Sequence, residues 1–109
     1  MAQFLVQVSY TPEAWASLVK NPQDRIAVVS KAVEKLGGTV DSGWMSLGDY
    51  DTVLVMQMPD TVSAAAFAVA IAAGGACKTV KTTALLSVAE GMEAMKKAGG
   101  LGYTAPAKG

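Results

Sequence analysis

The sequence predicts a small α+β domain with a four-stranded antiparallel sheet, in the order β-α-β-β-α-β, followed by one further helix. Two observations lead to this prediction. Segments with strand-like alternation are interleaved with segments that carry helix caps and helical apolar spacing, and a Gly-Asp turn joins two strands into a hairpin. With 109 residues the chain has the length of one domain, which we expect to span residues 1–98.

Local chemistry marks the first strand and the helices that follow it. Residues 3–10 are rich in β-forming side chains that alternate between two faces. Residues 11–13 (Thr-Pro-Glu) then supply an N-cap, a proline in the first helical position and an acid in the first turn. Asn21–Pro22 repeats the cap-then-proline signal, so we expect the helical region to break and restart there. Gly37–Gly38 is expected to end the second helix.

The middle of the chain is predicted to form a hairpin. Residues 39–47 and 51–58 pair around a two-residue turn at Gly48–Asp49, and this register places Trp44 opposite Val53. Apolar side chains then lie on both faces of the sheet near its middle. Because the two helices cover only one face, we expect a partner subunit to cover the other.

The second half repeats the helix–strand pattern and adds a helix. Asp60 is expected to cap an alanine-rich helix, and residues 77–86 are expected to form the last strand. Ser87 and Glu90 form a capping box at the start of the appended helix. Residues 99–109 are rich in Gly, Pro and Ala, and we expect a flexible tail that adds little to the core.

This order is the split βαβ, ferredoxin-like pattern. Three stretches of the chain also resemble the GYD-domain family, small bacterial and archaeal proteins named for a Gly-Tyr-Asp motif. These stretches are Thr11–Glu13 with Arg25–Ile26 and Leu36–Gly38, then Leu47–Asp51, then Pro59–Asp60 with Val80–Thr83. The resemblance implies a ferredoxin-like fold of the dimeric α/β-barrel type, in which two sheets pair back to back. It implies no particular activity.

Composition argues against several classes of function. Nine Lys and Arg residues balance nine Asp and Glu residues, and a basic excess typical of nucleic-acid binding is absent. The sequence has no histidine and a single cysteine, so the usual zinc and haem sites and Ser-His or Cys-His catalysis lack their residues. We therefore expect no cofactor and no metal. Cys77 is either a reactive thiol beside Lys78 or a small buried hydrophobe.

The same features suggest a location and partners. The longest apolar run, residues 64–73, is too short to span a bilayer, and no secretory signal is visible at the N-terminus. We expect a cytoplasmic protein that associates with copies of itself and has a possible small-molecule ligand. We expect no nucleic-acid partner and no membrane.

One cluster of side chains is a candidate ligand-binding site: Trp44, Asp49, Tyr50 and Asp51, with Lys81 on a later strand. A carboxylate and a phenol near a sheet end can bind or protonate a small polar ligand. The structural interpretation is turn chemistry, in which a backbone amide or Lys81 binds the carboxylate of Asp51.

Two functions from different classes remain open at this stage. The first is a small oligomeric protein that binds a small molecule or acts through assembly. The alternative is a cofactor-free isomerase or oxygenase that acts on a small hydrophobic substrate in a cavity between sheet and helices. A closed cavity with a buried acid would indicate the enzyme. A large exposed apolar patch on the helical or tail side would indicate assembly.

Overall fold

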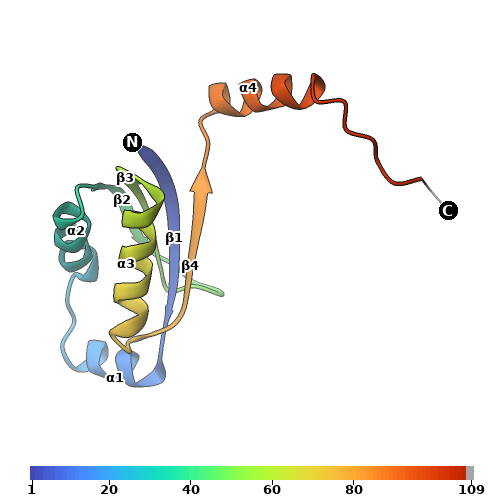
Figure 1. Ribbon diagram of the computed structural model, residues 1–109. Helices are drawn as coiled ribbons and strands as arrows, with labels where there is room; N and C mark the ends of the chain where they lie inside the picture. Colours follow the sequence, from blue (N-terminus) through green and yellow to red (C-terminus); the bar gives the residue numbers. More distant parts are fainter. Residues whose placement is uncertain (108–109) are drawn as a thin grey trace.

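The computed structural model describes residues 1–107, in which one β-sheet is packed against helices (Figure 1). Its elements are β1 (Ala2–Tyr10), α1 (Pro12–Lys20), α2 (Arg25–Lys35), β2 (Thr39–Met45), β3 (Thr52–Met58), α3 (Thr61–Ala73), β4 (Cys77–Leu85) and α4 (Val88–Gly99). The sheet has the order β2-β3-β1-β4, and each neighbouring pair is antiparallel. Helices α2 and α3 lie on one face of it. The predicted α+β, ferredoxin-like fold is confirmed.

The helix starts follow from their capping residues. Thr11, Asp60 and Ser87 are N-caps as predicted, and Ser87 exchanges both hydrogen bonds of a capping box with Glu90. The predicted cap at Asn21 is wrong, because that residue ends α1. Helix α2 is capped instead by the Asp24 carboxylate, which accepts from the amide three residues later at 3.1 Å.

From Ser42 to Met45 the hairpin has the predicted register, but its loop is longer. A bulge between Val40 and Ser42 shifts the pairing of the first part of β2 by one residue. Trp44 lies opposite Val53, and the last backbone contact between the strands runs from the Ser46 amide to the Asp51 carbonyl at 2.9 Å. The two-residue turn is therefore not formed. The amide of Asp51 donates to the carbonyl of Val8 at 2.8 Å, so Asp51 bonds to β1 through its amide and to the β2 side of the hairpin through its carbonyl.

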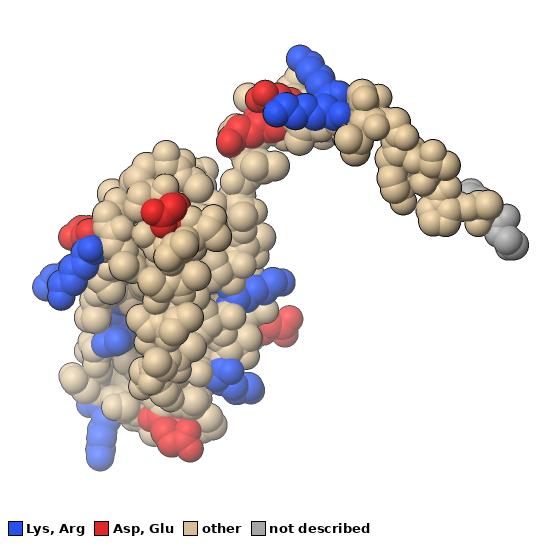
Figure 2. All heavy atoms as spheres, in the orientation of Figure 1, with Lys and Arg blue, Asp and Glu red and all other residues tan. Residues whose placement is uncertain are grey.

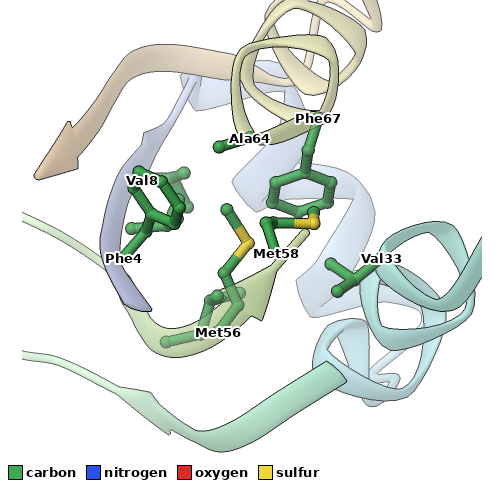
Figure 3. Close-up of a cluster of buried hydrophobic side chains, with 9 residues drawn as sticks. Phe4, Val8, Val33, Met56, Met58, Ala64 and Phe67 are labelled. Carbon is green, nitrogen blue, oxygen red and sulfur yellow. The ribbon is translucent and has the colours of Figure 1, made fainter. Parts of the chain in front are cut away.

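The core lies between the sheet and the two helices (Figure 3). Alternate residues of β1 and β3 point toward the helices, as the period-two pattern of a strand requires. Val33 of α2 and Phe67 of α3 meet them from the other side and are almost completely buried. The full set of buried apolar residues is Phe4, Val6, Val8, Val33, Leu54, Met56, Met58, Ala64 and Phe67.

On the opposite face of the sheet, no helix lies among residues 1–107 (Figure 1). Three apolar residues lie at its centre: Leu5 of β1, and Val53 and Val55 of β3. Leu5 is opposite Val55 and diagonal to Val53. Trp44 continues this apolar strip onto β2 and is 66% exposed. We call this surface the bare sheet face.

Helix α4 projects from the body, as Figure 1 shows, and makes no substantial contact with the other elements among residues 1–107. The radius of gyration is 17.6 Å, against about 13 Å for a compact domain of this length. The apolar side chains of α4, Val88, Met92 and Met95, are all exposed. None of the described helices combines the length and apolar character needed to cross a bilayer.

The chain after α4 has neither helix nor strand as far as residue 107. Leu101 and Tyr103, its two large apolar residues, are about three-quarters exposed (75% and 74%). They do not contribute to the core. The predicted tail includes residues 108–109, which lie outside the described residues.

Candidate functional site

The structure separates the residues of the candidate cluster. Trp44 pairs with Val53, Val53 pairs with Gln7, and Gln7 pairs with Lys81, so the four form one row across the bare sheet face. Trp44 and Lys81 occupy the two ends of this row on the edge strands. Three strand spacings, about 14 Å, lie between them.

Asp51 is fixed to two elements outside the hairpin. Its Oδ2 atom accepts a hydrogen bond from the backbone amide of Tyr10 at 2.8 Å and one from Nε1 of Trp15 at 3.3 Å. The rings of Tyr10 and Trp15 also meet edge to face, with centroids 5.4 Å apart. The prediction that a backbone amide binds the carboxylate of Asp51 is confirmed. Lys81, the alternative partner, lies on β4. Asp51 therefore joins the end of β1, helix α1 and the hairpin.

The two neighbours of Asp51 in the cluster do not join it. Asp49 is exposed, and Tyr50 is half-buried in the hairpin loop. A ligand-binding role for these five residues stays a prediction.

We expect Asp51→Ala to lower the free energy of unfolding by about 1–3 kcal/mol, because the amide of Tyr10 and the indole N–H of Trp15 lose their acceptor. Asp51→Asn should cost less, because an amide oxygen can take the place of Oδ2. Urea denaturation followed by Trp fluorescence measures both variants.

The matched control is Asp49→Ala, an exposed acid in the same loop, whose effect should stay within about 0.5 kcal/mol. If Asp51→Ala unfolds at the wild-type urea concentration, the hydrogen bonds of this carboxylate do not stabilise the fold.

A cavity lies elsewhere, between the helix layer and the sheet. Its volume is about 460 Å³, within the range of about 300–1,000 Å³ usual for small-molecule sites. Apolar side chains from α1, α2, α3, β1 and β3 form most of its wall. These include Leu18, Val28, Val29, Leu54, Phe67 and Ile71.

The polar groups of the cavity wall are few, and most already have partners. The hydroxyl of Tyr10 shares a hydrogen bond with Oγ1 of Thr52 at 2.9 Å. Arg25 donates from Nη1 to Oε1 of Gln23 at 2.9 Å. No carboxylate lies among the described residues that line the cavity. The cavity is thus a largely apolar pocket that opens to solvent and carries one cationic side chain.

Cys77 also lines this cavity and is half-buried. Burial raises the pKa of the Cys77 thiol, and the charge of Arg25 lowers it by a smaller amount. A thiol with a raised pKa is a weak nucleophile at neutral pH. This favours the prediction of a small apolar residue over that of a reactive thiol.

The alternative function placed a cavity between the sheet and the helices, but the residues of its wall were not predicted, because they are spread from Val6 to Cys77. One signal was available: Arg25 is among the residues that resemble the GYD-domain pattern. A cation at the first position of an amphipathic helix is normally a solvated residue, and only the tertiary structure places it against the cavity.

The sequence matches the GYD domain family over residues 4–95, and the chain belongs to this family. The fold is similar to the crystal structure of MtbAldR, with a TM-score of 0.57 and 17% sequence identity. That similarity covers 79% of this chain and 53% of MtbAldR, so this chain corresponds to about half of that protein. At this identity the likeness concerns the fold alone. No curated protein sequence matches the chain significantly.

Proposed function

We propose that this protein binds a small, largely apolar molecule in the cavity between its sheet and its helices. The observation that carries the proposal is the chamber of about 460 Å³, which the fold leaves open between α2, α3 and the sheet. Its size suits a small molecule, and its apolar wall would gain about 25 cal/mol for each Å² of apolar ligand surface removed from water.

The composition of the cavity wall supports binding over catalysis. An isomerase or oxygenase without a cofactor needs a general base beside its substrate. The described lining residues include no carboxylate, and the sequence contains no histidine. The hydroxyl of Tyr10 is occupied by Thr52, and burial raises the pKa of Cys77.

We also propose that the protein works as a homo-oligomer in which a second copy covers the bare sheet face. Strands of up to nine residues in a four-stranded sheet span about 30 Å by about 19 Å, or roughly 600 Å². A standard interface buries about 800 Å² of the surface of each partner, so the bare sheet face supplies most of the area that one needs. The formal net charge of zero leaves no overall repulsion between two copies.

Light scattering at micromolar concentration should therefore give the mass of a dimer or a multiple of one. Val53→Lys, which places a charge at the centre of the bare sheet face, should shift the protein toward monomer because that charge loses its hydration in the interface. A clean monomer of 11.2 kDa for the wild type would contradict the proposal.

Assembly is a second candidate function, because a specific surface favours it. Helix α3 has no charged residue, and Figure 2 shows a broad uncharged surface on the helical side of the body. Val62 and Val69 of this helix are 78% and 66% exposed. An uncharged helix surface, together with the projecting α4, suits contacts between several copies.

Ligand binding is tested by filling the cavity. Ala70 and Ala66 are both exposed residues of α3, but only Ala70 lies at the edge of the cavity and is among its lining residues. We expect Ala70→Phe to weaken binding of two eight-carbon probes, octan-1-ol and octanoate, by at least tenfold in calorimetric titrations. Ala66→Phe should bind both probes like the wild type.

Two results would contradict the proposal. One is that neither probe binds to the wild-type protein at concentrations below its aggregation threshold. The other is that Ala70→Phe and Ala66→Phe have the same effect, which would place the probes on the outer surface of α3.

A further inference from the structure

The described residues of the cavity wall carry one positive charge and no negative charge. Among the described lining residues Arg25 alone carries a charged side chain. It is half-buried, at the first residue of α2, where the helix meets the connection from α1. Every other side chain around the chamber is apolar or neutral.

Arg25 has no acidic partner for its charge among the described residues. Its hydrogen bond goes to the neutral amide of Gln23, which occupies one of the five N–H donors of the guanidinium. The nearest acid in sequence, Asp24, uses its Oδ1 atom to cap α2 at the amide of Ala27. The remaining donors of Arg25 are available to a ligand.

The positive charge of Arg25 also acts inside the chamber. The thiol of Cys77, at the start of β4 on another part of the wall, responds to it, because Arg25 lowers the pKa of that thiol against the larger effect of burial. An anion in the cavity would meet the same positive potential.

We propose that the ligand is a small carboxylic acid, bound as its anion, with the carboxylate on Arg25 and the apolar body against the walls from α2, α3 and the sheet. This inference rests on the proposed binding function. A carboxylate matches the planar fork of a guanidinium with two parallel hydrogen bonds. A single cation neutralises one negative charge, so the cavity suits a monoanion better than a phosphate ester, whose charge approaches −2.

The test compares octanoate with octan-1-ol at pH 7 by calorimetry on the full chain. We expect the wild type to bind octanoate at least tenfold more tightly than the alcohol. Arg25→Gln should remove this preference, with a loss of affinity for octanoate at least tenfold larger than any change for octan-1-ol. Arg25→Lys, which keeps the charge but not the fork, should retain part of the preference.

The matched control is Lys31→Gln, which removes an exposed cation of the same helix that lies outside the cavity lining. It should keep the full preference for octanoate. Thermal unfolding of each variant checks that the fold is intact.

The possible failures are distinguishable. Equal binding of the two probes to the wild type overturns the assignment of a carboxylate and leaves the apolar binding function standing. An equal loss in Lys31→Gln and Arg25→Gln also overturns it, because the preference would then come from overall charge. No binding of either probe overturns both the carboxylate and the binding function.

Discussion

Replacement of Gly38 by alanine should destabilise the protein by about 3 kcal/mol or more, at the upper end of the cost of overpacking. A Cβ atom at this position would lie 2.3 Å from the carbonyl oxygen of Gln57 and 2.6 Å from the sulfur of Met58. The first contact is with backbone, which cannot rotate away as a side chain can. Either α2 or the end of β3 must therefore move, and Val33 and Met58 of the core move with them.

Urea denaturation with Gly91→Ala as the control measures this effect. Gly91 lies inside α4, and a Cβ there meets nothing within 4 Å. Alanine is the better helix former by about 1 kcal/mol, so this variant should lose no stability. If Gly38→Ala is as stable as the wild type, the α2–β2 connection packs less tightly against β3 than it does in the structure.

Phe67→Ala should cost about 3–5 kcal/mol, because it removes the largest fully buried side chain. Phe67 is 1% exposed and lies beside Met58 of β3 in the core, as Figure 3 shows. It also borders the ligand cavity, so its truncation widens that chamber rather than letting the core collapse around the gap. A total stability of about 5–15 kcal/mol leaves little margin for such a loss.

The control on the same helix is Val69→Ala, whose side chain is 66% exposed. It should change the free energy of unfolding by no more than about 0.5 kcal/mol. If Phe67→Ala and Val69→Ala have equal effects, α3 does not provide the core described here.

The parts of the fold predicted correctly are those that local chemistry determines. The caps at Thr11, Asp60 and Ser87 each depend on a side chain and an amide three residues later. The pairing of Trp44 with Val53 was predicted from a two-residue turn and is confirmed although the loop is longer, while the bulge between Val40 and Ser42 was not predicted. The cap at Asn21 and the two-residue turn were wrong. The hairpin closes through the bond from the Ser46 amide to the Asp51 carbonyl, and α2 is capped by Asp24, whose carboxylate accepts from the amide of Ala27.

Proximity in the sequence did not predict which side chains of the candidate cluster lie together in the structure. Asp49, Tyr50 and Asp51 are adjacent in the chain, yet Asp51 turns to Tyr10 and Trp15 rather than to its neighbours. Trp44 and Lys81 share a face of the sheet but lie on opposite edges. The cavity, in contrast, depends on how α2 and α3 sit over the sheet, which no single stretch of sequence encodes.

Native mass spectrometry of the freshly purified protein tests the central claim, a ligand-binding cavity in a self-associating chain, most directly. We expect a dimer or a multiple of one that carries a small molecule, or that takes up octanoate when it is added. Ala70→Phe should lose this adduct, and Ala66→Phe should keep it. A bare 11.2 kDa monomer that forms no adduct at saturating octanoate would contradict the account.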